Sequence, residues 1–308
     1  MSRVTSRLGL AALAAFLVAD AALVGMALRS TAGGAEGAGP ARATSPPASA
    51  SASATPSGGE TTADDAPELA ASPLTVGVVA VDGDHAWRFD VGSCRKGGST
   101  LALTDDGGST WQPRVAPFDT TMRLRVRDDG SAFAIGSDEE CAARFRQAPK
   151  DVPEWGSEGD VPDAWYRDPK TSTVVGTAEG ETAKPCDAAP VVDLSVIDEG
   201  AAVLCGDGRV LSSKTGATWE EGPQVPRALA VATTPQRTLL ARTLDGCAGV
   251  AVVDAADPDT ALGCAEVDLT EVKPGTIALS VRGTHAWLLA GPSVLRSSGD
   301  LSEWAQAD

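Results

Sequence analysis

Aromatic and cationic side chains gather in one short stretch of the sequence. Trp155 is followed by Trp165-Tyr-Arg-Asp-Pro169, which holds Arg167 and the single tyrosine of the chain, Tyr166. Large rings and guanidinium groups are the side chains that most often anchor a binding interface. The same rings would also serve to pack a loop against the domain. Trp155, Trp165, Tyr166 and Arg167 are therefore the candidate partner-binding residues, with loop packing as the alternative.

The two histidines are the second place to look for chemistry. They stand in matching pentapeptides, Gly83-Asp-His-Ala-Trp87 and Gly283-Thr-His-Ala-Trp287. A catalytic or metal-binding histidine needs partner side chains beside it, whereas a repeated structural position explains both copies. The sequence contains no GxSxG, HExxH or Gly-rich phosphate motif, and its acidic clusters lack EF-hand spacing. We expect no catalytic residue, no cofactor and no metal site.

Net charge narrows the class of partner. The chain of 308 residues carries a formal net charge of −17. Such a charge repels a phosphate backbone, so nucleic acid is not an expected partner. A negative surface of this size also keeps an exposed protein soluble.

The N-terminal residues 1–29 resemble a segment that enters a membrane. Arg3 and Arg7 precede an apolar run over residues 8–28, which Asp20 interrupts and Arg29 closes. A helix of this length spans a hydrocarbon core of about 30 Å, and the first arginines favour a cytoplasmic N-terminus. Small residues near the end of the run also resemble a signal-peptide cleavage site. We expect a signal anchor in the membrane, or else a signal peptide and a secreted protein.

The next residues, 30–73, are composed mostly of Ala, Ser, Thr, Pro and Gly. A segment with so little apolar surface is typical of a disordered linker. The sequence therefore predicts one folded domain over residues 74–308, outside the cytoplasm.

A turn motif repeats in this domain and predicts its fold. Thr104-Asp-Asp-Gly-Gly-Ser-Thr-Trp111 recurs as Ser212-Ser-Lys-Thr-Gly-Ala-Thr-Trp219 and, more weakly, as Ser297-Ser-Gly-Asp-Leu-Ser-Glu-Trp304. An Asp in such a turn accepts hydrogen bonds from turn N–H groups, Gly supplies a positive φ, and the Trp packs between sheets. The residues that define the pattern are Thr104, Asp106, Gly108, Thr110, Trp111, Ser212, Gly216, Thr218, Trp219, Ser297 and Trp304.

The spacing of these copies sets the size of the repeating unit. We call each copy of this turn motif a box. The tryptophans that end the boxes recur with a period of about 43 residues, if Trp155 is counted as the end of a degraded copy. The two His-Ala-Trp segments share this period. This is the length of a four-stranded propeller blade. We expect an all-β propeller of five blades, one of them near Arg227–Val267 without a box. The extra residues between Gly156 and Ala189 form either an inserted loop or a sixth, short blade.

The turn motifs resemble the Asp-box (BNR) repeats of sialidase-like and photosystem-assembly-factor-like β-propellers. The resemblance covers residues 74–308 through one complete motif and weaker copies. It implies a propeller fold, in which the boxes are structural turns. Since one fold hosts many activities, it implies little about function.

Six cysteines lie in the predicted propeller, and an even number in an exported chain predicts three disulfides. In the repeat frame, Cys94 and Cys141 occupy nearly equivalent positions of adjacent blades. Of the 15 ways to pair six cysteines, we therefore prefer Cys94–Cys141, Cys186–Cys205 and Cys247–Cys264.

The resemblance to sialidases raises an enzymatic alternative. Sialidases use an arginine triad, a tyrosine nucleophile with a glutamate partner, and an aspartate acid/base. Here Tyr166 is the only tyrosine, and Trp165-Tyr-Arg-Asp-Pro169 is a weak echo of the family's arginine motif, placed after the first box instead of before it. We expect a non-catalytic extracytoplasmic binding or assembly module for a protein or glycan partner. The alternative is a diverged glycoside hydrolase, which would be indicated if Tyr166 clustered with several arginines in one cleft.

Overall fold

The structure is a computed structural model that describes residues 69–150 and 154–307. Within these ranges every regular element is a strand. None of the described residues forms a helix that could span a membrane. The expected anchor over residues 8–28 and the linker up to residue 68 lie outside the described residues.

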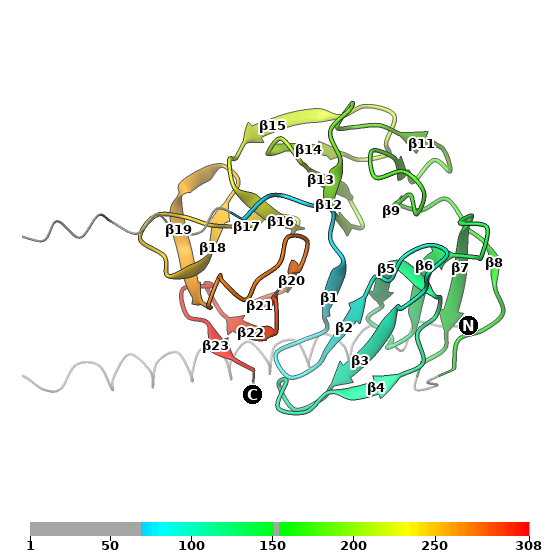
Figure 1. Ribbon diagram of the computed structural model, residues 1–308, viewed down its shortest axis with the longest axis horizontal. Helices are drawn as coiled ribbons and strands as arrows, with labels where there is room; N and C mark the ends of the chain where they lie inside the picture. The colour runs from blue at the N-terminus through cyan, green and yellow to red at the C-terminus, as the bar shows by residue number, and fades with distance from the viewer. Residues whose placement is uncertain (1–68, 151–153, 308) are drawn as a thin grey trace, which may run out of the picture. The chain divides into compact units, whose positions relative to one another are not determined.

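The strands form six antiparallel sheets around a central axis (Figure 1). Each sheet is one blade and consists of strands that are consecutive in the chain. Blade 1 contains β1 (Val76–Ala80), β2 (Ala86–Asp90), β3 (Thr100–Thr104) and β4 (Gln112–Arg114); blade 2 contains β5 (Thr120–Val126), β6 (Ala132–Ser137), β7 (Ala143–Ala148) and β8 (Gly159–Asp160). Blade 3 contains β9 (Tyr166–Arg167), β10 (Val175–Gly176) and β11 (Thr182–Ala183); blade 4 contains β12 (Val191–Ile197), β13 (Gly200–Cys205), β14 (Arg209–Ser213) and β15 (Glu220–Gln224). Blade 5 contains β16 (Ala228–Thr233), β17 (Thr238–Arg242), β18 (Gly249–Asp254) and β19 (Asp257–Glu266); blade 6 contains β20 (Ile277–Arg282), β21 (His285–Ala290), β22 (Ser293–Ser298) and β23 (Ala305–Gln306).

The protein is thus an all-β propeller with six blades, and the expectation of five blades was one too few. The predicted blade without a box is blade 5. The extra residues between Gly156 and Ala189 form blade 3, so they are a sixth, short blade and not an inserted loop. Its strands have only two residues each, which is why no strand-length apolar pattern marks them in the sequence.

The first strands of the complete blades line the axial channel and hold one another through side-chain hydrogen bonds. The Thr233 amide of β16 donates to Ser195 Oγ of β12 at 2.8 Å. The Ala80 amide of β1 donates in the same way to Ser280 Oγ of β20 at 3.0 Å. Both bonds join equivalent strands of adjacent blades, so the channel wall is continuous on these two sides.

Blade 3 lacks this first strand. Trp165, just before β9, packs edge-on against Trp219 of blade 4 with ring centroids 5.7 Å apart. Trp87 of β2 and Trp287 of β21 pack in the same way against the box tryptophans Trp155 and Trp111. Since β2 and β21 are second strands, β9 corresponds to a second strand, and no described residue forms a first strand in blade 3.

The direction of β9 agrees with this assignment. The Trp165 carbonyl accepts a hydrogen bond from Arg123 in the middle of β5, whereas Arg167 donates to the Val192 carbonyl near the start of β12. Further along, the Ser172 carbonyl accepts from the Val191 amide. The chain from Trp165 to Ser172 therefore runs against β12, as a second strand does and a first strand does not.

The turn between β3 and β4 shows why the box residues are needed. The Asp106 carboxylate accepts from the Thr110 amide at 2.9 Å and from the Thr110 hydroxyl at 2.7 Å. These bonds and one from the Thr104 hydroxyl lower the pKa of Asp106 to about 2. Gly108 has φ +95 and lies against Ala307 of blade 6, where a side chain would not fit. The turn thus joins blade 1 to the neighbouring blade.

The later copies of the turn keep the tryptophan but lose this hydrogen bonding. In blade 4 the Gly216 amide donates to the hydroxyl of Ser213, which is buried, whereas the expected Ser212 is exposed. The hydrogen bond that Thr104 accepts from Gly108 in blade 1 is thus accepted in blade 4 by the residue after Ser212. In blade 6 the Ser297 hydroxyl is buried without a partner among the described residues, while Trp304 packs against the apolar core that blades 5 and 6 share.

Three disulfides join the expected pairs of cysteines. Cys94–Cys141 connects blades 1 and 2, Cys186–Cys205 ties the end of blade 3 to β13, and Cys247–Cys264 lies within blade 5. The Cα atoms of the three pairs are 5.5–5.6 Å apart, and no cysteine in the described part of the chain is free. Structural disulfides of this kind are typical of an oxidising, extracytoplasmic compartment.

Ring closure between blades 6 and 1 is non-covalent. Trp287 Nε1 donates to the Asp82 carbonyl at 2.8 Å, and Arg296 donates to the Gly83 carbonyl at 3.0 Å. Residues just before β1 strengthen the ring, since Leu69 is buried against blades 5 and 6 and the Leu74 amide donates to the Val192 carbonyl. Packing of the chain thus begins before residue 74, within the segment assigned to the linker.

Candidate functional site

The structure separates the four candidate partner-binding residues. Trp155 packs against Trp87 and donates to the Val115 carbonyl at 3.0 Å. Trp165 is 4% exposed and packs against Trp219. Both rings therefore fill the spaces between blades, and the alternative of loop packing describes their positions. Whether either one also contacts a partner stays a prediction.

Tyr166 and Arg167 point in different directions from β9. The Tyr166 ring covers Gly176 of the neighbouring strand. Arg167 is 8% exposed, and its guanidinium donates to the Leu74 and Val192 carbonyls at 2.9 and 3.2 Å. Arg167 thus holds the residues just before β1 against blade 4. Its side chain also lines the end of the axial channel where β12 begins. The four residues do not form one exposed surface.

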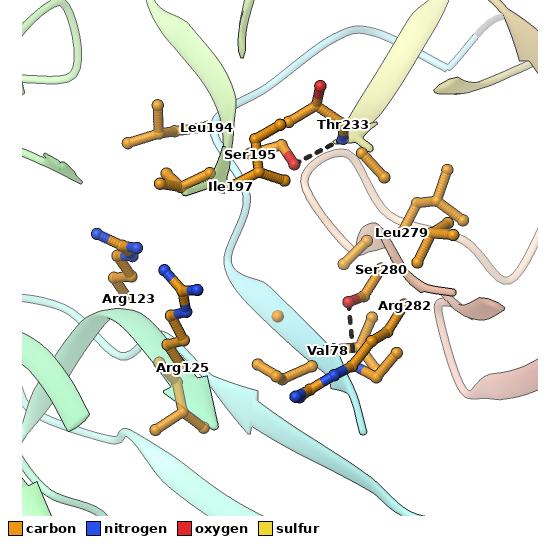
Figure 2. Close-up of a pocket in the computed structure, with 18 of the residues that line it drawn as sticks. Val78, Arg123, Arg125, Leu194, Ser195, Ile197, Thr233, Leu279, Ser280 and Arg282 are labelled. Carbon is orange, nitrogen blue, oxygen red and sulfur yellow. Dashed lines mark hydrogen bonds between the residues drawn. The ribbon is translucent and has the colours of Figure 1, made fainter. Parts of the chain in front are cut away.

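The described part of the propeller contains an axial channel with a volume of about 670 Å³. Where blade 3 has no described first strand, the channel is lined by residues of β5 and β12, and Figure 2 shows Arg123 and Arg125 pointing toward Leu194. We name this part of the channel the blade-3 groove. One wall consists of Arg123, Arg125 and Arg127 from β5 and the turn after it, and the other of Leu194, Val196 and Asp198 from β12 and its turn.

The arginine wall results from strict alternation along β5. Successive side chains of a strand point to opposite faces, and Leu124 packs into the apolar core shared with blade 1. Arg123, Arg125 and Arg127 therefore point to the other face, toward blade 3. Because no first strand covers this face, no apolar partner is available there. The guanidinium groups of Arg123 and Arg127 instead lie over the Phe133 ring, each 5.1 Å from its centroid.

Arg123 is a buried cation that forms no salt bridge within the described part of the chain. Its Nη1 donates to the Trp165 carbonyl at 2.7 Å, but no described carboxylate lies within salt-bridge distance of it. Burial, followed by the charge of Arg125, lowers the pKa of Arg123 to about 9, so the group is still cationic at neutral pH. A dehydrated cation beside a second cation is an environment that an anionic group would stabilise.

Two ion pairs cross the mouth of the channel, and each passes over a blade. Arg125 of blade 2 pairs with Asp198 of blade 4 at 2.6 Å, over the incomplete blade 3. Arg282 of blade 6 pairs with Asp128 of blade 2, over blade 1. The Asp198 side chain is 80% exposed, and exposed pairs contribute little to stability. An incoming carboxylate could therefore replace Asp198 on Arg125 at small cost.

The remaining candidates for chemistry do not converge on a reaction centre. His85 accepts or donates at Asp82, 2.9 Å away, and His285 lies beside Gly83 at the seam between blades 6 and 1. Among residues 69–150 and 154–307 no group of His, Cys, Asp and Glu is arranged to hold a metal ion. Tyr166 is not one of the described residues that line the channel. Burial and then the Asp168 carboxylate raise the pKa of its phenol.

The comparisons with known proteins add similarities of fold. No protein-family model matches the chain, and no curated protein matches it. Among solved structures, YCF48 bound to a D1 peptide is 14% identical, with 77% of this chain and 81% of that chain covered and a TM-score of 0.37. The BP39L lectin from Burkholderia pseudomallei is 12% identical, with coverages of 76% and 83% and a TM-score of 0.41.

A third similar structure is the GH74 xyloglucanase from Xanthomonas campestris, at 16% identity and a TM-score of 0.42. The match covers 78% of this chain but only 48% of the xyloglucanase. At these identities and scores, the class that can be stated is the one that the sheets already define, a six-bladed β-propeller.

Proposed function

We propose that this propeller is a non-catalytic binding or assembly module, and that it binds its partner at the mouth of the axial channel. The observation that supports the site is the arginine wall of the blade-3 groove, which lies open in a chain with a net charge of −17. Clustered guanidinium groups beside a concave surface are typical of binding sites for anionic groups.

The chemistry around Tyr166 argues against the sialidase-type alternative. A tyrosine nucleophile must be activated by a neighbouring base or a lowered pKa, whereas burial and Asp168 raise the pKa of Tyr166. Its ring packs on Gly176 and does not share the channel with Arg123 and Arg125. We therefore assign recognition, not hydrolysis, to the arginines.

In this proposal the boxes belong to the Asp-box (BNR) repeats and have a structural role. The hydrogen bonds of Asp106 and the inter-blade packing of Trp111 support that assignment. The N-terminal run over residues 8–28 anchors the domain outside the cytoplasm, which agrees with the three disulfides. The partner is then another extracytoplasmic molecule, a protein or a glycan.

Photo-crosslinking in intact cells tests the position of the site. A benzoylphenylalanine at Glu199, an exposed residue of the channel mouth, is expected to give one discrete adduct. The same group at Val115, which is 78% exposed and does not line the channel, serves as the matched control. Arg125→Ala in the Glu199 background should weaken the adduct. Adducts of equal yield at both positions, or none at Glu199, would refute the site.

Turnover measurements test the absence of catalysis. The purified full-length chain is expected to release no product from a fluorogenic sialoside. Hydrolysis that disappears in Tyr166→Phe would overturn the proposal and establish the glycosidase alternative.

A further inference from the structure

The edge of β9 that faces away from β10 has no strand beside it among the described residues. The Asp168 amide donates to the Val174 carbonyl, and Tyr166 and Arg167 pair with Gly176 and Val175 of β10. In an antiparallel pair, alternate residues direct their backbone groups to the partner and away from it. The backbone groups of Trp165 and Arg167 therefore point away from β10, into the space where the first strand of blade 3 would lie.

The Trp165 carbonyl shows what occupies that space at present. It accepts a hydrogen bond from the Arg123 guanidinium and not from a strand. The Arg123 side chain thus donates a hydrogen bond that the backbone of a first strand would otherwise donate. An exposed strand edge of this kind is a template for pairing with a further segment of chain.

The first strands of the other blades set the length of segment that blade 3 would need. First strands in the complete blades have five to seven residues. The groove extends from Arg167, at the end of the channel where β12 begins, to Arg125 and Asp198 at the mouth, and it shares a channel of about 670 Å³. An added first strand of this length would lie between β5 and β12, beside β9.

The charge of the groove selects among such segments. Three arginines face the groove from one wall. Of the carboxylates that line the described channel, Asp128 pairs with Arg282 and Asp193 accepts from the Val231 amide, whereas Asp198 and Glu199 are exposed at the mouth. Leu194 and Val196 on the opposite wall present apolar surface. A segment that alternates acidic and apolar residues would present carboxylates to the arginines and apolar side chains to β12, since the side chains of a strand alternate between its two faces.

We propose that the blade-3 groove is a receptor for an extended, acidic segment of a partner protein, which adds to β9 as the missing first strand of blade 3. This inference rests on the proposed function and specifies its ligand. Backbone bonds to Trp165 and Arg167 provide affinity, and the Arg123 and Arg125 guanidinium groups select carboxylates. Asp198 is displaced from Arg125 when the segment binds.

Selection from a phage-displayed random heptapeptide library against the full-length chain in detergent tests the inference. The enriched peptides should carry Asp or Glu at a fixed position among alternating apolar residues. Arg125→Gln should weaken a synthetic enriched peptide at least about tenfold, the loss expected when a charge-assisted hydrogen bond is removed. Methylation of alternate backbone amides of the peptide should abolish binding, because it removes strand pairing.

A variant that fills the groove provides the decisive control. Val196 lies on the β12 wall outside the apolar core clusters, so Val196→Trp should block the peptide while the chain stays folded. Val115→Trp adds the same ring away from the channel and should leave affinity unchanged. Slower hydrogen exchange at the Arg167 amide in the complex gives a readout that does not depend on any variant.

The outcomes separate this inference from the proposed function. No enriched peptide, equal binding by Val196→Trp with an unchanged melting temperature, or indifference to amide methylation would overturn strand addition. Peptide binding that appears only after residues 61–68 are deleted would also overturn it, because those residues would then be the segment that fills the groove. If the Glu199 adduct persists in Val196→Trp, the channel mouth still binds its partner and only the strand addition is wrong.

Discussion

Blades 1 and 3 are both held against a neighbouring blade, but by different sets of contacts. Blade 1 has four strands, a complete turn motif and a tryptophan pair that joins it to blade 6. Blade 3 has three strands of two residues each, but it too is joined to its neighbour by a tryptophan pair, Trp165–Trp219. A disulfide between Cys186 and Cys205 adds a covalent tie at its end.

The difference teaches that the contacts between blades, more than the length of the strands, define a blade. Strand pairing in blade 3 is minimal, yet its core residues Val175 and Cys186 are fully buried against blade 4. Across the position of the first strand, β5 and β12 are linked by the exposed Arg125–Asp198 ion pair, which contributes little to stability. The arginines of β5 lie on the face of the strand that has no apolar packing partner.

The largest expected effect concerns the tryptophan that holds blade 3. Trp165→Ala should lower the free energy of unfolding by about 3–5 kcal/mol, the usual cost of removing a buried large aromatic side chain. Trp287→Ala, at the equivalent position of blade 6, should cost a similar amount, because both rings are buried. Chemical denaturation of the full-length variants measures both values. A loss below about 1 kcal/mol for Trp165→Ala would mean that its ring does not hold the blades together.

The disulfides should rank next. Replacing a native pair by alanines typically costs about 2–5 kcal/mol. Cys94 and Cys141 are 47 residues apart and Cys186 and Cys205 are 19 apart, so the chain-entropy argument gives about 1 kcal/mol more for the first pair. Hydrogen exchange should nevertheless rise locally in residues 166–183 only when Cys186–Cys205 is removed. Equal exchange in both variants would show that blade 3 does not depend on its own disulfide.

The smallest effect is expected at the turns. Asp106→Asn should lower the melting temperature slightly at neutral pH, whereas Lys214→Ala should not, since blade 4 has no carboxylate at that position. The pKa of Asp106 is about 2 instead of 3.8, so its contribution is complete above pH 3.8 and is lost as the pH falls through 2. Melting curves between pH 6 and 2 should therefore converge for the wild type and Asp106→Asn. A constant gap down to pH 2 would contradict the assigned role of the carboxylate.

Much of the ring could be predicted from spacing, because blades 1, 2, 4 and 6 each end in a tryptophan of the turn motif or its weaker copies, and the long gap between Trp219 and Trp304 leaves room for blade 5. Blade 3 was left open because its strands are too short to show alternation. One feature did mark it: Ala164-Trp165 repeats Ala86-Trp87 and Ala286-Trp287, and this identifies the start of a second strand.

The groove was not predicted, although the sequence contains its clearest sign. Met122-Arg-Leu-Arg-Val-Arg127 places arginine at every second position of a strand that lines a propeller channel. Alternation alone does not show whether the polar face meets solvent outside the ring or inside it. The polar face of β5 lies inside the ring because blade 3 has no described first strand to cover it. The position of β12 relative to β5 shows this, and the sequence does not give that position.

Each blade is built from one uninterrupted stretch of chain, and no blade mixes strands from the two ends of the propeller. The seam between blades 6 and 1 is therefore chemically the same kind of boundary as the one between blades 4 and 5. The order in which the blades follow one another in the gene is then not fixed by the ring. Circular permutation, with new termini between Gln224 and Ala228 and a short link across the old seam, would leave every sheet intact.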